Sequence, residues 1–225
     1  MDMYKLKFIL LSDATFGRGD GVVSLVNAEV EHDRYGLPYL RGRTLKGLLA
    51  EAYADIRFAL QQSPASKSLA RWDAAARILF GDPGSKLKQQ AQVHIGDACL
   101  PADLRSALAA DMESESPTHT ADAILNSLTA IRRQTAMDVT GKPEAGSLRA
   151  MRVVLRGVIF ESQLRFVLCP DADILAILAA CSMGMRRLGT GRNRGRGHVL
   201  TRLYDAEDCD ITLQHFEHFE KEVKQ

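Results

Sequence analysis

The order of strand-like and helix-like segments is the feature that most limits the folds open to this chain. Apolar residues alternate with lysines and then run together over residues 3–11, which is typical of a β-strand. An amphipathic helix follows over residues 45–62, and we expect Thr44 to N-cap it and Pro64 to follow its end. A second helix is expected over residues 68–79. The first third of the chain is therefore predicted to run strand, helix, helix.

The rest of the chain returns to this alternation after an irregular insert. The expected segments are a strand over 91–99, a polar insert over 101–149 with one weak helix, paired strands over 151–168 that turn at Gly157, a buried helix over 172–185 that Asp171 N-caps, and a strand over 197–204. The tail from residue 211 fits a strand at its start and a helix at its end. The order is close to βαββαβ, so we predict an α+β, ferredoxin-like core with long loops.

Composition excludes several classes of protein. The net charge is +1, so affinity for nucleic acid must come from a local patch of charge. The four cysteines form no CxxC pair and the six histidines show no metal-ligand spacing, which indicates a reduced, cytoplasmic compartment without structural zinc. The N-terminus lacks the apolar run of a signal peptide, and no segment reaches transmembrane length. We expect no membrane partner.

The most unusual stretch is MGMRRLGTGRNRGRGHV, residues 183–199, with five arginines and five glycines. Glycines let a backbone approach a phosphate closely, and guanidinium forks bind phosphates bidentately. The stretch is not G-x-x-x-x-G-K-[ST] and precedes a strand, which excludes a Walker loop and a Rossmann turn. A nucleic-acid backbone is the favoured ligand, and a flexible Arg-Gly linker is the alternative.

Two further basic stretches lie at the start of a predicted helix or outside the predicted regular segments. YLRGRTLKG places Arg41, Arg43 and Lys46 at the start of the first helix, where backbone N–H groups and the positive dipole end favour an anion. IRRQTAMDVTGK places Arg132 and Arg133 on a protruding loop. Solvated surface charge explains the first stretch equally well and is the commoner explanation for the second.

Acids gather in the first long loop, which runs up to the first helix. They are Asp13, Asp20, Glu29, Glu31 and Asp33. Such a group can bind a metal or position a ribose hydroxyl for attack, but it more commonly caps loops or is solvated. No Ser/His/Asp or Cys/His pairing follows from the spacing.

Five blocks of the sequence, in order, resemble the RAMP superfamily of CRISPR effector subunits, and above all the backbone subunits of type III complexes. They are GLPYLRGRTLKGLLAEAY, ILFGDPGS, VHIGDACL, IRRQTAMDVTGKPEAGSLR and the terminal glycine-rich loop. The resemblance implies a modified RRM-like, ferredoxin-type core with a projecting thumb. It implies one RAMP domain over 1–225, with the core at about 1–60, 91–100 and 150–205, a helical insertion at about 64–90 and a thumb-like insertion at about 101–149.

The resemblance also implies that the protein binds a CRISPR guide RNA and works with complementary target RNA and other RAMP subunits. By position, the resemblance implies RNA contacts at Arg43, Lys46, Arg132, Arg133, Arg192, Asn193, Arg194 and Arg196. We expect Arg41, Thr44, Arg186 and Arg187, which lie in the same basic segments, to contact RNA as well. Aromatic residues make up only 6% of the chain, which favours contact with the RNA backbone over stacking on bases.

Active backbone subunits of the family carry a target-cleaving aspartate before the P-x-I-P-G turn. The matching position here is Val26 or Asn27, and neither is an acid. We therefore predict a guide-binding subunit that does not itself cut RNA and needs no cofactor. The alternative is a metal-dependent endoribonuclease that uses Mg²⁺ and a first-loop acid such as Asp20. A third, weaker option is an RNA-binding protein outside any CRISPR system.

Overall fold

The computed structural model describes residues 3–17, 28–81, 91–136, 138–144 and 146–224. Its central sheet has four antiparallel strands in the order β2-β5-β1-β6. The core elements are β1 (Met3–Leu10), α1 (Gly42–Gln61), β2 (Val93–Ile95), β5 (Ile159–Phe166), α5 (Ala172–Gly184) and β6 (Val199–Tyr204). Their order is βαββαβ and the first strand lies between the third and the fourth, so the predicted ferredoxin-like α+β core is confirmed.

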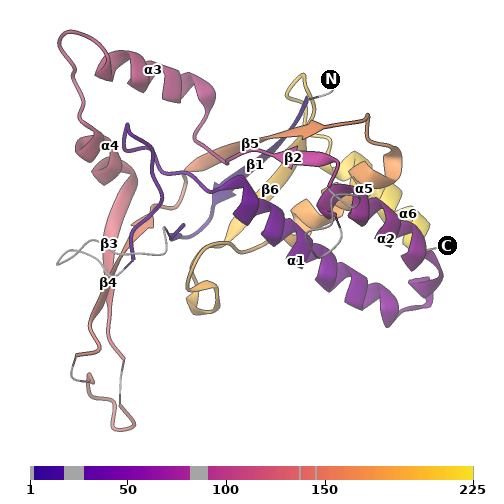
Figure 1. Ribbon diagram of the computed structural model, residues 1–225. Helices are drawn as coiled ribbons and strands as arrows, with labels where there is room; N and C mark the ends of the chain where they lie inside the picture. The colour runs from indigo at the N-terminus through magenta and orange to yellow at the C-terminus, as the bar shows by residue number, and fades with distance from the viewer. Residues whose placement is uncertain (1–2, 18–27, 82–90, 137, 145, 225) are drawn as a thin grey trace.

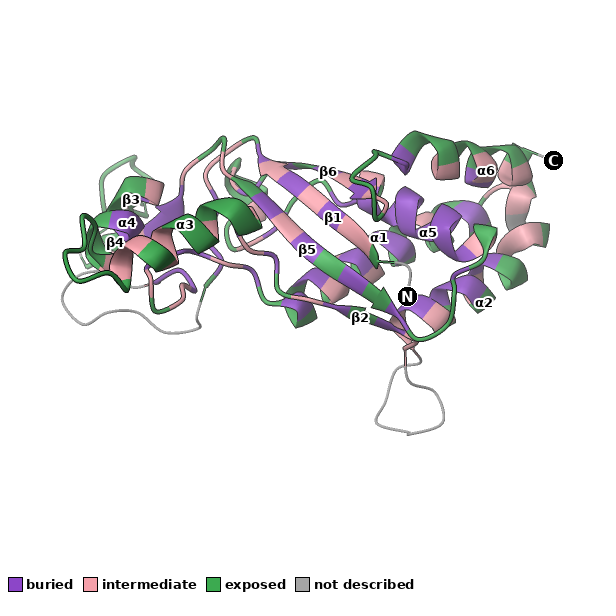
Figure 2. Ribbon diagram, turned by 90° about the horizontal axis from the view of Figure 1, so that it is seen from above, coloured by how far each residue is buried: buried purple, intermediate pink, exposed green. Residues whose placement is uncertain are grey.

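Helices cover one face of the sheet, and the hydrophobic core lies between them and the strands (Figure 1). In β1 the alternate residues Leu6, Phe8 and Leu10 are buried, because successive side chains of a strand point to opposite faces. Figure 2 shows this alternation as stripes along β1 and β5. Phe8 stacks on Phe160 of β5 with 5.2 Å between the ring centroids. The sheet therefore presents one apolar face to α1 and α5.

The most deeply buried helix is α5, whose residues from Ile174 to Ser182 are all buried. It contacts α1, β6, α2 (Leu69–Phe80) and α6 (Thr212–Lys224), so apolar residues suit every side of it. The Asp171 carboxylate accepts a hydrogen bond from the Ile174 N–H at 2.8 Å, which confirms the predicted N-cap. None of the helices in the described ranges is long and apolar enough to cross a membrane.

The tail from residue 211, whose sequence fits a strand at its start and a helix at its end, forms the helix α6, which packs on the helical layer. Trp72 of α2 is fully buried, and its ring centroid lies 5.0 Å from that of Phe219 of α6. The short 3₁₀ helix η1 (Pro64–Ser68) joins α1 to α2. The predicted second helix is thus confirmed, and it belongs to a layer of helices outside α5.

A second group of elements projects from one end of the sheet (Figures 1 and 2). It contains α3 (Ala102–Met112), α4 (Ala121–Leu128), β3 (Thr129–Gln134) and β4 (Arg149–Val154). β3 and β4 pair antiparallel as a separate hairpin. The sequence prediction of one weak helix followed by a loop was wrong, since this region has two helices and a hairpin. Only one side chain of β3 is buried and three are exposed, so no apolar alternation marks the strand.

Two other predictions, one about strand pairing and one about strand length, were wrong. β4 and β5 do not pair with each other; β4 pairs with β3, and β5 pairs with β1 and β2. The chain turns between them at Gly157, which has a φ of 88° and donates its N–H to the carbonyl of Leu10 at 2.7 Å. The strand expected over 91–99 shrinks to β2, because Ala98 and Cys99 form only isolated bridges.

The first helix starts three residues earlier than predicted, and Thr44 does not cap it. Arg41 is the N-cap residue, and its own side chain makes no capping hydrogen bond. Gly42 begins α1, and position 42 requires glycine because a Cβ there would lie 2.2 Å from the carbonyl oxygen of Ile95. The Gly42 N–H donates to the carboxylate of Asp97 at 2.8 Å. Contacts with the end of β2 therefore determine where the helix begins.

Candidate nucleic-acid interface

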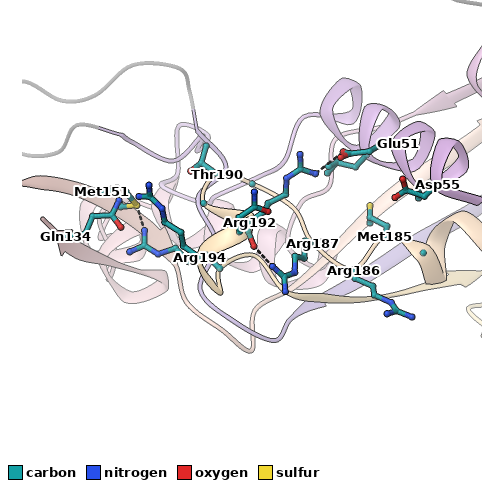
Figure 3. A pocket seen from close by; sticks show the side chains of 17 residues that line it. Glu51, Asp55, Gln134, Met151, Met185, Arg186, Arg187, Thr190, Arg192 and Arg194 are labelled. Carbon is teal, nitrogen blue, oxygen red and sulfur yellow. Dashed lines mark hydrogen bonds and ion pairs between the residues drawn. The ribbon is translucent and has the colours of Figure 1, made fainter. Parts of the chain in front are cut away.

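A cleft of about 880 Å³ lies between α1, the glycine-rich loop and the β3–β4 hairpin (Figure 3). Its charged lining residues are Arg186, Arg187, Arg192, Arg194, Arg196, Glu51 and Asp55. Gln134 of β3 and Met151 of β4 line the hairpin side, and Asn193 lies on the loop side. Among the described lining residues, five guanidinium groups face two carboxylates, so this part of the cleft carries an excess of positive charge.

The glycine-rich loop is fixed by backbone hydrogen bonds to the core. The Leu188 N–H donates to the Gly197 carbonyl at 2.9 Å, and the Gly197 N–H donates to the Asp13 carbonyl at 2.9 Å. The Thr190 N–H donates to the Thr15 carbonyl at 3.0 Å. Gly197 has a φ of 68°, and a Cβ there would lie 1.8 Å from the Leu188 oxygen. The loop is therefore a folded element, contrary to what a flexible linker requires.

The arginines of the cleft differ in how far they are neutralised. Arg192 forms an ion pair with Glu51 at 2.8 Å, and Arg187 donates to the Arg192 carbonyl oxygen. Arg196, on the glycine-rich loop, contacts the sulfur of Met151, which lies on the hairpin side of the cleft. Within the described ranges, the Arg186 and Arg194 guanidinium groups have no hydrogen-bond or ion-pair partner. Most of the positive charge of the cleft is thus available to an anionic ligand.

The basic residues at the start of α1 lie outside this cleft. Arg41 forms an ion pair with Glu31 at 2.7 Å, and Asp97 already supplies an anion to the first N–H of the helix. Lys46 lies about 160° from the cleft residue Leu48 around the helix. Burial lowers the pKa of Lys46 below its usual range. Arg43 and Thr44 are exposed at the same helix end.

Arg132 and Arg133 lie on β3, so the prediction that a loop carries them was wrong. The Asp13 carboxylate accepts hydrogen bonds from Nε and Nη2 of Arg132, at 3.0 and 2.8 Å. Arg133 is exposed and points to the other face of the hairpin, because strand side chains alternate. The two neighbouring arginines therefore cannot contact the same phosphate.

The described acids of the first loop have structural partners. Glu29 is buried and forms an ion pair with buried Arg152 of β4 at 2.8 Å. The Asp33 carboxylate accepts the N–H groups of Tyr35 and Leu37, at 2.9 and 3.0 Å. Asp20, Val26 and Asn27 lie outside the described residues. In the part of the chain that the structure describes, no three His, Cys, Asp or Glu side chains come together as a possible metal site.

Several residues that line the cleft were not predicted as site residues, among them Glu51, Asp55, Gln134 and Met151. A signal existed for the two acids, because their four-residue spacing places them on one exposed side of the predicted helix. The two hairpin residues carry no such signal. Their place in the cleft depends on the pairing of β3 with β4.

The fold and the cleft together define a ferredoxin-like α+β protein with an arginine-rich cleft beside a projecting hairpin. The sequence model of the RAMP superfamily matches residues 7–199, and the chain belongs to this superfamily. The resemblance to this superfamily seen in the sequence is therefore confirmed.

The solved structures with a similar fold include two of the type III-B Cmr-beta complex. A chain of type III-B Cmr-beta bound to cognate target RNA, determined by cryo-EM, has a TM-score of 0.57 and 15% identity, covering 89% of this chain and 96% of that chain. A chain of the apo state of type III-B Cmr-beta has the same TM-score and coverage and 14% identity. No curated protein matches the chain. At these identities the likeness is one of fold.

Proposed function

We propose that this protein is an RNA-binding structural subunit of a type III CRISPR ribonucleoprotein. It holds the backbone of the guide RNA and helps to present the guide for pairing with target RNA. The observation that carries the proposal is the cleft, in which a hydrogen-bonded glycine loop presents five arginines opposite the hairpin. Membership of the RAMP superfamily and the fold shared with type III-B Cmr-beta chains support it.

The chemistry of the cleft suits a nucleic-acid backbone better than exposed bases. Arg186 and Arg194 have no partner among the described residues, so each can donate a fork of hydrogen bonds to a phosphate. No aromatic side chain belongs to the described lining, whereas proteins that read single-stranded bases stack them on aromatic rings. Contact with phosphate and ribose is therefore the favoured mode of binding.

The remaining predicted contacts lie outside the cleft, at the start of α1 and on β3, where Arg132 is paired with Asp13. Arg41, Arg43, Thr44 and Lys46 stay proposed contacts at the start of α1, for a part of the RNA that passes beyond the cleft. Arg133 stays a proposed contact on the outer face of the hairpin. The proposed partners are the guide RNA, complementary target RNA and other RAMP subunits, as the target RNA in one of the Cmr-beta structures suggests.

We also propose that the subunit neither cuts RNA nor requires a cofactor. Glu29 and Asp33 are engaged in an ion pair and a turn, which removes two first-loop acids from the set available for catalysis. The nuclease alternative rests on Asp20 and Mg²⁺. Incubating the assembled complex with complementary RNA and Mg²⁺ separates the two: we expect no cut, and cuts that vanish in Asp20→Ala would establish the nuclease.

RNA binding is tested with the double variant Arg186→Ala/Arg194→Ala, which removes two charges without removing a contact that holds the loop. We expect fluorescence anisotropy with single-stranded guide RNA to give at least roughly tenfold weaker binding. The magnitude of the slope of log K against log salt should decrease by about 1.4, since each contact with a single-strand phosphate contributes about 0.7 to it. The matched control is Arg77→Ala/Arg165→Ala, two exposed arginines outside the cleft. Equal affinities for the two variants would contradict the assignment.

A further inference from the structure

A second hollow, of about 370 Å³, lies beside the glycine-rich loop. It is lined by Leu11, Ser12, Asp13, Arg132, Arg156 and Gly195. Leu11, Ser12 and Asp13 follow the end of β1, and Arg156 lies in the turn between β4 and β5. Gly195 comes from the loop that forms a wall of the main cleft. The hollow is therefore built where the sheet, the hairpin and the loop meet.

Asp13, the one acid among the described residues that line this hollow, is already neutralised. The Oδ2 atom of Asp13 accepts both hydrogen bonds from Arg132, and its Oδ1 atom accepts the backbone N–H of Arg156 at 3.2 Å. Its backbone carbonyl accepts the Gly197 N–H. Asp13 thus fixes Arg132 and joins three elements, without cancelling the charge of the Arg156 side chain. Over the described ranges, the exposed guanidinium of Arg156 has no hydrogen-bond or ion-pair partner.

The two hollows adjoin each other along both the loop and the hairpin. Gly195 lines the second hollow, while its neighbours Arg194 and Arg196 line the main cleft. Arg132 is the direct cross-strand partner of Met151, which also lines the main cleft. Gln134 of the main cleft points to the same face of β3 as Arg132, about 6.7 Å along the strand. A single chain of phosphates can therefore pass from one hollow to the other.

From this continuity we infer a second phosphate subsite, in which Arg156 and Arg132 bind an RNA strand that continues past the glycine loop. Arg156 is a binding residue that the sequence pattern did not indicate. The inference rests on the proposed function, because it extends the RNA path beyond the main cleft. The shared chemistry is a phosphodiester, which either the guide strand or the complementary target strand can supply.

The test compares Arg156→Ala with Arg165→Ala, which removes the same charge from an exposed position on β5. Binding is measured with single-stranded guide RNA, and then with complementary RNA added to the guide-loaded protein. If the subsite holds the guide, Arg156→Ala weakens the first binding roughly three- to tenfold. If it holds the target strand, the second binding weakens by that factor and the first is unchanged. Arg165→Ala should leave both unchanged.

Failure of this inference can be told apart from failure of the proposed function. If Arg186→Ala/Arg194→Ala weakens guide binding but Arg156→Ala weakens neither step, the main cleft binds RNA and the second subsite does not exist. If neither variant changes binding, the proposed function itself is wrong. If Arg156→Ala keeps the wild-type melting temperature, any loss of RNA affinity comes from the missing side chain. If its melting temperature is lowered, the loss of affinity is assigned to folding, and the subsite is overturned.

Discussion

Arg192 of the glycine-rich loop donates to the carboxylate of Glu51 on α1 at 2.8 Å, across the opening of the arginine-rich cleft. The side chains of the pair are 38% and 53% exposed, so it adds at most about 1 kcal/mol to stability. Its larger effect is electrostatic, because the carboxylate competes with any phosphate for the same guanidinium.

We therefore predict that Glu51→Gln strengthens RNA binding severalfold. The substitution releases Arg192 and removes a negative charge from the cleft, so affinity should rise most at low salt, where screening is weakest. Binding titrations at two salt concentrations measure this. The control is Glu217→Gln, an exposed acid on α6. Weaker binding by Glu51→Gln would mean that Glu51 itself contacts the RNA, for instance through a ribose hydroxyl.

A pair of glycine substitutions tests whether the loop is a folded element. At Gly197 an added Cβ would meet the Leu188 oxygen at 1.8 Å, whereas at Gly195 nothing lies within 4 Å. Both glycines have a positive φ. We expect Gly195→Ala to cost about 1–2 kcal/mol for its backbone alone. Gly197→Ala adds the clash and should exceed about 3 kcal/mol. Urea unfolding measures both, and equal costs would indicate a loop free to rearrange.

The buried pair of Glu29 and Arg152 gives a prediction about stability. Both side chains are less than a tenth exposed, and Arg152 also donates to Asn126 and Thr129, at 3.0 and 3.1 Å. Glu29→Ala leaves a buried charge without its counter-ion and should cost about 3–5 kcal/mol. Glu220→Ala, which breaks an exposed pair with Lys224, should cost less than about 1 kcal/mol. If chemical denaturation finds that Glu29→Ala and Glu220→Ala lose similar free energies of unfolding, a structural role for Glu29 is excluded.

Acid should weaken the helical layer through Asp173 at the start of α5. Arg71 of α2 donates to this carboxylate at 2.5 and 2.7 Å and lowers the pKa of Asp173, and His218 of α6 adds a contact at 3.0 Å. Because the pKa of Asp173 is lower in the folded state than the unfolded value of about 3.9, its stabilisation is complete above that pH. It is lost as the pH falls through the folded value.

The prediction is that the wild type loses more free energy of unfolding between pH 5 and pH 3 than Asp173→Asn does, as measured by urea unfolding at each pH. All other carboxylates are common to both proteins, so the difference isolates Asp173. Parallel losses would show that this carboxylate contributes nothing to acid sensitivity.

Much of the core could be predicted because its signals are local. The alternation in β1, the apolar run of α5 and the Asp171 cap are each contained in a short window of sequence. The start of α1 could not be predicted in this way. Thr44 is a good capping residue, but Gly42 begins the helix because Asp97, 55 positions away in sequence, bonds its N–H. A contact that distant leaves no mark beside the helix.

The hairpin escaped prediction for a related reason. β3 has few buried side chains, so its residues lack the alternation that marks half-buried strands. For the site, the arginines of the loop were evident from composition, whereas the second wall of the cleft was not. Glu51 and Gln134 lie opposite the loop only after α1 and the hairpin have packed around it. The chemistry of the loop could thus be inferred early, and the shape of its cleft could not.

The central claim is that RNA occupies the cleft between the glycine-rich loop and the hairpin. Hydrogen–deuterium exchange of the protein, with and without single-stranded guide RNA, tests it most directly. We predict slower exchange in peptides that cover residues 184–197 and in those that cover β3, with no change in α6. Protection confined to α6 or to α3, with the glycine loop unchanged, would contradict it.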